Sequence, residues 1–190
     1  MEEKKKKAAV IFPGVGYHTD KPLLYYSKKL AVAGGYEILE VSYGELPSGI
    51  KGNAAKMMEA FEMASARVEE QLRDAALDSF EDVLFISKSI GTAVAAAFAR
   101  KHQIPAGQIY YTPVEESFLA IGTTGIVFHG TSDPWARTEV IETECAKRNL
   151  PLYETAGANH SLETGNVQED LKNLTEIMKK TEEYIKGAVG

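Results

Sequence analysis

The sequence has little that would cross-link the chain, bind an anionic polymer or hold it in a membrane. Its only cysteine, Cys145, has no partner for an internal disulfide. A formal net charge of -6 disfavours nucleic acids and anionic membranes as partners, because neutralising phosphates requires a positive face. No apolar run reaches the roughly 18 residues of a membrane-spanning helix, and only about five apolar residues separate the basic run Lys4 to Lys7 from Pro13, too few for a secretory signal. We therefore expect a cytoplasmic protein.

Metal-ligand and dinucleotide motifs are also missing. The His, Asp and Glu residues show no ligand spacing such as His-Glu-x-x-His. The glycine-containing segment from Phe12 to Tyr17 lacks the further glycine that a dinucleotide fingerprint places at the start of a helix, and Thr19 and Asp20 follow instead. We expect neither a metal nor a cofactor.

Apolar runs of strand length alternate with helical patterns along the chain, which fits a single domain spanning residues 1–190. Such alternation predicts parallel strands joined by right-handed crossovers, with helices on both faces of the sheet. The expected architecture is a three-layer α/β/α sandwich around a doubly wound, mainly parallel six-stranded sheet. Strands are predicted near residues 8–12, 36–43, 83–86, 108–111, 125–128 and 151–154, and helices near 23–33, 53–77, 92–102, 135–149 and 167–186.

The most informative segment runs from Phe85 to Ala93, where an apolar strand stops at a tight turn and an alanine-rich helix begins. This layout is typical of a nucleophile elbow, in which a strand-to-helix turn exposes a serine above the sheet. Ser89 occupies the nucleophile position, Gly91 supplies the small residue after it, and Ser87 stands where the motif usually has glycine. The motif alone is weak evidence, because a serine at a helix start also serves as an N-cap.

Two later loops complete the pattern. The apolar run at residues 126–128 leads to a loop with Asp133, and the one at 152–154 leads to a loop with His160. Nucleophile, acid and base therefore appear in the order Ser, Asp, His, each just past the carboxyl end of a different strand, where open α/β sheets place their chemistry. A serine hydroxyl needs a base to remove its proton, and the imidazole needs an acid to fix its tautomer.

These residues resemble the α/β-hydrolase superfamily, in particular its small, lidless serine hydrolases similar to dienelactone hydrolase and short-chain carboxylesterases. The resemblance covers nearly the whole chain and implies the strand order 2-1-3-4-5-6. It also implies that Ser89 is the nucleophile, Asp133 the acid and His160 the base. The departure from the family pattern is Ser87 in place of the first glycine, with Lys88 between the two serines.

The resemblance further implies an oxyanion hole made of two backbone N–H groups. One belongs to Ile90, directly after the nucleophile. The other belongs to Val15, because Pro13-Gly14-Val15-Gly16 resembles the family's His-Gly-x-Gly segment. The alternatives for this glycine-containing loop are a flexible turn or a phosphate cradle.

Several residues compete for these roles. His18, His102 and His129 are alternative bases, and Glu115 and Glu116 are alternative acids that more simply begin a helix, where the dipole favours acidic residues. His160 and Asp133 are preferred because their loops are expected to reach over the elbow.

Only about a dozen residues, 112–124, follow the fourth strand, where related hydrolases commonly insert a cap, so no sizeable cap is expected. We predict an open site edged by Tyr17, His18 and Trp135, together with Pro113 and Phe118, with Trp135 equally able to anchor the core. Such a site suits a small ester, thioester or related acyl substrate. The sequence leaves open an acyltransferase or thioesterase with the same residues, a noncatalytic binding module of the same fold and a flavodoxin-like nucleotide binder, and it does not predict the oligomeric state.

Overall fold

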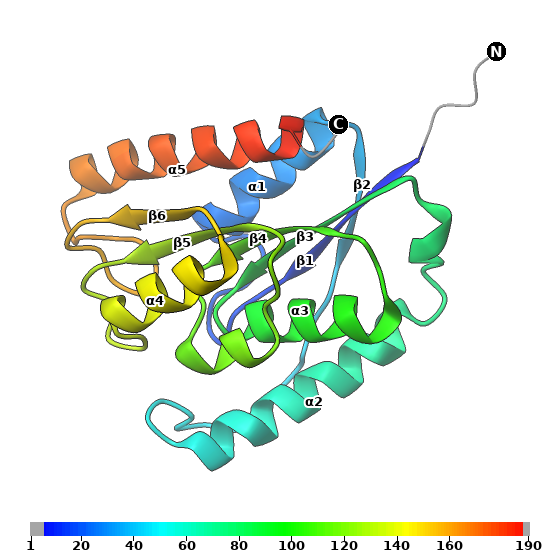
Figure 1. Cartoon of the computed structure of the whole chain (residues 1–190), viewed down its shortest axis with the longest axis horizontal. Helices are drawn as coiled ribbons and strands as arrows, with labels where there is room; N and C mark the ends of the chain where they lie inside the picture. The colour runs from blue at the N-terminus through cyan, green and yellow to red at the C-terminus, as the bar shows by residue number, and fades with distance from the viewer. Residues whose placement is uncertain (1–5, 188–190) are drawn as a thin grey trace.

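The computed structural model describes residues 6–187, so Lys4 and Lys5 of the basic run lie outside the described residues. Strands and helices alternate along this part of the chain, with two short 3-10 helices among them (Figure 1). The elements are β1 (Lys7–Phe12), α1 (Pro22–Ala33), β2 (Tyr36–Glu40), α2 (Ala54–Leu72), η1 (Leu77–Ser79), β3 (Asp82–Lys88), α3 (Ile90–His102), β4 (Gly107–Tyr111), η2 (Glu115–Leu119), β5 (Ile126–Gly130), α4 (Thr138–Arg148), β6 (Leu152–Thr155) and α5 (Val167–Gly187).

The six strands form one sheet in the order β2-β1-β3-β4-β5-β6, and every neighbouring pair is parallel. This confirms the predicted fold class and strand order. The order reverses at β1, because the chain moves first to β2 on one side and then to β3 on the other. Since all strands run the same way, their carboxyl ends meet at one edge, and the loops from there carry Ser89, Asp133 and His160.

Successive residues of each strand face opposite sides of the sheet, and each side is covered by helices (Figure 1). Ala9, Ile11, Leu84 and Ile86 pack in a core beneath α1 and α5. On the other face, Val10 and its neighbours pack against α2 and α3, and a third cluster joins the sheet to α4. Both faces of β1 and β3 are therefore buried, which explains their nearly continuous apolar sequences.

Three predicted boundaries are wrong, and each has a local cause. The strand predicted at 36–43 ends at Glu40, where its pairing with β1 ends at Ile11. The helix predicted at 53–77 ends at Leu72, and a turn with left-handed Ala76 then leads into η1. The helix predicted from residue 135 begins only at Thr138, because the preceding residues form the loop that holds Asp133.

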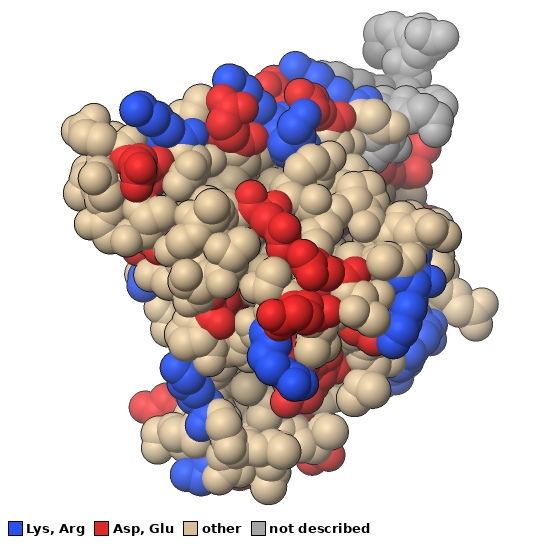
Figure 2. Space-filling model, turned by 60° about the vertical axis from the view of Figure 1, so that its left-hand side comes forward, with Lys and Arg blue, Asp and Glu red and all other residues tan. Residues whose placement is uncertain are grey.

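The surface carries charges of both signs. Figure 2 shows basic and acidic side chains mixed over one face, with acidic ones gathered near its centre. This distribution agrees with the net charge of -6. Within residues 6–187, none of the helices combines the length and the apolar character needed to cross a bilayer.

Candidate active site

Ser89 lies in the turn between β3 and α3, in a strained backbone conformation. Its φ is 55° and its ψ is -126°, a combination that a residue with a side chain adopts only when its surroundings enforce it. Its backbone N–H donates to the carbonyl of Tyr111 at the end of β4 (3.0 Å), and its own carbonyl accepts from the N–H of Thr92 (2.9 Å). The turn is therefore held between the sheet and the first turn of α3, as expected of a nucleophile elbow.

Two glycines let the segment after β1 approach this turn. A methyl group added to Gly91 would lie 2.5 Å from the carbonyl oxygen of Pro13 and 2.6 Å from that of Phe12. A methyl group on Gly14 would lie 3.1 Å from the Cβ of Ser89. The absence of side chains at these positions brings the 13–17 loop directly against Ser89.

Ser87, the departure from the usual elbow pattern, fits without distorting the strand. Its side chain is buried, and its hydroxyl donates to the carbonyl of Ile109 in β4 (3.0 Å). The close approach to β1 falls at Gly91 instead. A serine is therefore tolerated at position 87 because its hydroxyl finds an acceptor in the neighbouring strand.

Asp133 lies in the loop after β5, and its side chain is fully buried. One carboxylate oxygen, Oδ1, accepts the backbone N–H of Trp135 (2.8 Å), an Asx turn that fixes the side-chain orientation. The loop packs closely on the one after β6: a methyl group on Gly130 would lie 2.6 Å from the carbonyl oxygen of Asn159 and would also overlap the carbonyl oxygen of Ala158.

The loop after β6 places His160 between the other two side chains. Asn159 stabilises the conformation of this loop, because its side-chain Oδ1 accepts the backbone N–H of Ser161 (2.7 Å). The Thr112 hydroxyl, at the end of β4, donates to the His160 carbonyl (3.0 Å). The imidazole also stacks on the ring of Trp135, with centroids 5.2 Å apart.

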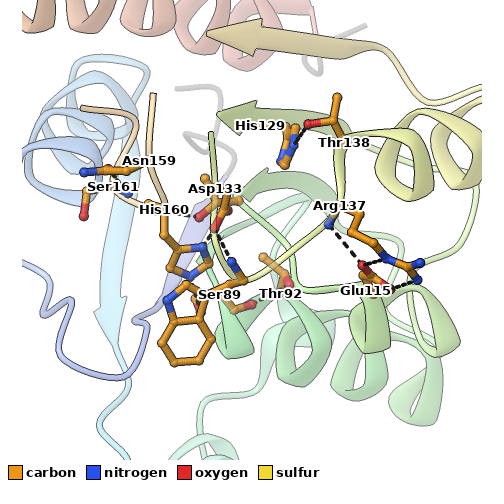
Figure 3. A network of polar contacts seen from close by, with 12 residues as sticks. Ser89, Thr92, Glu115, His129, Asp133, Arg137, Thr138, Asn159, His160 and Ser161 are labelled. Carbon is orange, nitrogen blue, oxygen red and sulfur yellow. Dashed lines mark hydrogen bonds and ion pairs between the residues drawn. The ribbon is translucent and has the colours of Figure 1, made fainter. Parts of the chain in front are cut away.

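The three side chains singled out from the sequence meet in a hydrogen-bonded row (Figure 3). His160 Nε2 lies 2.8 Å from Ser89 Oγ, and His160 Nδ1 lies 2.7 Å from Asp133 Oδ2. Because an ionised carboxylate only accepts, Nδ1–H donates to Asp133 and leaves Nε2 free to accept the Ser89 hydroxyl proton. The row has the polarity that activation of a serine requires.

The surroundings of His160 favour its neutral form. Burial lowers the pKa of the imidazole, and the charges of Lys88 and His129 lower it further, while the hydrogen bond to Asp133 and its charge raise it. The net pKa lies below the usual histidine value. A neutral imidazole near neutral pH is the form that accepts a proton.

The two predicted oxyanion donors border the same turn. Ile90 is the first residue of α3, where N–H groups have no partner inside the helix. Val15 lies in the turn closed by the backbone hydrogen bonds between Gly14 and Tyr17. Within residues 6–187, the N–H groups of Val15 and Ile90 have no hydrogen-bond acceptor.

The residues predicted to edge the site differ in exposure. Trp135 is half-buried, stacks on His160 and packs against the core below α2 and α3. His18 is exposed. Tyr17 is 5% exposed, and its hydroxyl accepts the N–H of Leu23 (3.1 Å). Phe118 packs in the cluster beneath α4 rather than at the site. Substrate contacts of Tyr17, His18 and Trp135 stay predictions.

The rival residues lie elsewhere or have other partners. His102 lies at the end of α3 with its Nε2 2.9 Å from Glu69. His129 is buried in β5 and hydrogen-bonds to Thr138 (2.9 Å). Glu115 begins η2, as expected of a helix start, and pairs with Arg137 (2.9 Å). None of them contacts the row of Ser89, His160 and Asp133.

Two positions near the row were not identified from the sequence. Lys88 precedes Ser89, and its side chain is fully buried. Thr112 hydrogen-bonds to the His160 backbone and has a left-handed φ of 43°. The position of Lys88 in the elbow was visible in the sequence, but its burial was not, and nothing in the sequence indicated the Thr112 contact.

The described part of the chain holds no cluster of three or more His, Cys, Asp or Glu side chains suited to a metal ion. The hydrogen-bonded row and the backbone donors are the chemical groups gathered at the carboxyl edge of the sheet. They are the groups that acyl transfer to a serine uses.

Comparison with known proteins gives structural matches only. No protein-family model matches the sequence, and no curated protein matches it. An α/β-hydrolase-fold protein of unknown function from Agrobacterium tumefaciens superposes with a TM-score of 0.71 at 18% identity, covering 97% of this chain and 86% of that one. Est1E from Butyrivibrio proteoclasticus, solved with ferulic acid bound, gives a TM-score of 0.71 at 12% identity, covering 99% and 91%. A lidless serine hydrolase from Xanthomonas campestris gives 0.62 at 9%, covering 96% and 82%. The chain therefore has the α/β-hydrolase fold.

Proposed function

We propose that this protein is a serine hydrolase that cleaves a small ester, thioester or related acyl substrate through an acyl-enzyme on Ser89. The observation that supports this most directly is the position of His160, 2.8 Å from Ser89 Oγ and 2.7 Å from Asp133 Oδ2. Ser89, Asp133 and His160 would act as one catalytic triad. Solved proteins of similar fold include a serine hydrolase and an esterase.

In the first half-reaction, Ser89 Oγ attacks the substrate carbonyl carbon while His160 Nε2 takes the hydroxyl proton. The N–H groups of Val15 and Ile90 hold the resulting oxyanion, each contributing on the order of 3 kcal/mol. When the intermediate collapses, the bond to the leaving alcohol or thiol breaks and His160 returns the proton to it. The acyl group then remains on Ser89 as an ester.

In the second half-reaction, water takes the place of the leaving group. The water oxygen attacks the acyl carbonyl carbon while His160 accepts a proton from the water. The second tetrahedral intermediate then collapses and releases the acid. The proton returns from His160 to Ser89 Oγ. Asp133 accepts the hydrogen bond of His160 Nδ1–H and so stabilises the imidazolium in both halves.

The site's surroundings favour a small substrate. Residues 112–125 between β4 and β5 hold only the short η2, which leaves little chain to form a cap over Ser89. A cleft of about 340 Å³ adjoins Trp135 on the side of Ile50, Lys51 and Glu115, but neither Ser89 nor His160 lines it. We therefore place the protein in one domain without a sizeable cap, acting on a small molecule.

A fluorophosphonate probe tests this function directly. We expect a single adduct on the wild-type protein by intact mass, no adduct on Ser89→Ala, and labelling slowed by orders of magnitude in His160→Ala. A folded wild-type protein that never gains the adduct would refute the hydrolase and favour a noncatalytic binding module of this fold.

An acyltransferase or a thioesterase would use the same groups. The acyltransferase differs only in the molecule that accepts the acyl group, and the thioesterase only in the leaving atom, which is sulfur. Turnover of an activated ester in water, compared with turnover in added alcohol or amine, separates hydrolysis from transfer. Product acid formed without acceptor supports hydrolysis, and product that forms only with acceptor contradicts it.

A further inference from the structure

Lys88 is buried beside Ser89, the proposed nucleophile, where desolvation of its amine costs free energy. It is the last residue of β3 and its side chain is 0% exposed. Within residues 6–187, no Asp or Glu forms an ion pair with it. Its Nζ lies 5.0 Å from the centroid of the Tyr17 ring. Since an apolar side chain would fill this space without desolvating a charge, packing alone does not explain a lysine here.

The side chain of Lys88 lies under the loop that forms the candidate oxyanion hole. A methyl group on Gly14 would lie 3.3 Å from Lys88 Cγ and 3.1 Å from Ser89 Cβ. Lys88 is thus packed between the 13–17 loop and the end of the strand that carries the nucleophile. A charge at this place acts at short range and with little solvent screening on the groups around Ser89.

Charged and titratable groups on several elements act electrostatically on Lys88 and on His160. Asp133, after β5, raises the pKa of both. Lys21, before α1, lowers that of Lys88, and His129 lowers that of His160. Burial raises the pKa of the Tyr17 phenol, and Glu163 adds to this, so that ring stays neutral against Lys88.

The charge of Lys88 also acts on His160. Burial lowers the pKa of Lys88 to about 7, and the charge of Lys88 lowers the pKa of His160. A proton on Lys88 therefore disfavours a proton on His160. Below about pH 7 the amine holds its proton, and this is the range in which an isolated imidazole would also become charged.

We propose that Lys88 is a positioning residue for the base: its buried ammonium adds to the effect of burial in keeping His160 unprotonated at mildly acidic pH, so that Nε2 remains able to accept the Ser89 proton. This inference rests on the proposed role of His160 as the base. The proton that the base accepts is that of the Ser89 hydroxyl, and Lys88 itself gives up or takes none during the reaction.

The test uses Lys88→Met, which keeps the length of the side chain and removes its charge. Lys101→Met is the control, because Lys101 is an exposed residue of α3 that pairs with Glu69 of α2. The His160 imidazole is titrated by NMR in each protein, with its signal assigned by its absence in His160→Gln. Fluorophosphonate labelling rates are then measured across the same pH range.

We expect the His160 midpoint to rise by about one pH unit in Lys88→Met and to stay unchanged in Lys101→Met. Labelling should slow about tenfold on the acidic side and match the wild type on the alkaline plateau. An unchanged midpoint, or a rate lowered equally at every pH, would overturn the inference and leave Lys88 a packing residue. If the His160 midpoint rises in Lys88→Met but the probe never labels the wild-type protein, the result refutes the proposed function and not the effect of Lys88 on His160.

Discussion

Gly91 offers a sharp test of how the elbow is built. Replacing it with alanine puts a methyl group 2.5 Å from the Pro13 carbonyl oxygen and 2.6 Å from that of Phe12. Real Cβ atoms essentially never come within 3.0 Å of another heavy atom, so α3 and the end of β1 must separate by at least about half an ångström. Both contacts are to backbone, which cannot rotate away as a side chain can. The predicted change is therefore a shift of the loop that carries Val15.

The expected size of the effect follows from this displacement. Overpacking of a tight contact destabilises a fold by about 1–3 kcal/mol, and misplacing reacting groups by about 1 Å lowers the rate about 100-fold. We expect Gly91→Ala to have a free energy of unfolding roughly 2 kcal/mol lower than that of the wild type, and therefore to unfold at a lower denaturant concentration. Its fluorophosphonate labelling should slow by one to two orders of magnitude.

Gly122→Ala is the matched control for this prediction. Gly122 has nothing within 4 Å of the position a methyl group would take, and its φ lies outside the left-handed region. Stability is followed by denaturant unfolding and reactivity by intact mass after timed labelling. If Gly91→Ala labels within two- or threefold of the wild type and unfolds at the same midpoint as Gly122→Ala, the close approach of β1 to the elbow is not what positions the site.

Three further substitutions test the groups around Ser89. In Lys88→Met, removing a buried amine whose pKa falls from 10.5 to about 7 should stabilise the protein by up to roughly 5 kcal/mol below pH 7. Between pH 7 and 10.5 the unfolded wild-type chain binds one more proton than the folded one, so wild-type stability rises with pH in this range. The difference in free energy of unfolding between Lys88→Met and the wild type should therefore vanish towards pH 10.5. Denaturant unfolding at pH 6 and pH 10 checks this, and a pH-independent difference contradicts it. Asp133→Asn should leave the fold intact but lower the labelling rate on the order of 10⁴-fold. An amide that donates to His160 Nδ1 selects the tautomer with its proton on Nε2, which cannot accept the Ser89 proton. Labelling within tenfold of wild type would show that Asp133 is not the acid. Thr112→Ala should slow labelling about tenfold by freeing the His160 carbonyl, whereas Thr112→Ser keeps the hydroxyl and should match the wild type; equal rates in both variants would remove Thr112 from the positioning of His160.

The strand order and the meeting of Ser89, Asp133 and His160 were predictable because both depend on long-range regularities. Parallel strands place all their carboxyl ends at one edge, so residues that follow three strands lie along that edge, and the loops then bring their side chains together. The strand order was implied by the resemblance to α/β hydrolases, whereas the meeting of the three residues was predicted from the apolar runs and the loops after them. Those signals are strong here because the central strands are buried on both faces.

The details that the sequence did not predict depend on single contacts between distant segments. The helix expected at residue 135 starts at Thr138 because the Asp133 carboxylate accepts the Trp135 N–H. A helical pattern cannot reveal that this side chain holds the backbone in a turn instead. The contact from Thr112 to the His160 carbonyl joins residues 48 positions apart, and only the packed loops bring them together.

Lys88 shows how the two kinds of information combine. In the sequence it is a polar residue between two serines, and a lysine at the end of a strand would normally reach solvent. The structure buries it because the 13–17 loop folds over the elbow, and that loop approaches so closely because Gly14 and Gly91 lack side chains. The same two glycines that bring the candidate oxyanion donor to Ser89 therefore also desolvate Lys88. The geometry that would stabilise negative charge on the substrate and the burial of Lys88 thus have one structural cause, and any substitution that lifts this loop should weaken both the oxyanion hole and the effect of Lys88 on His160.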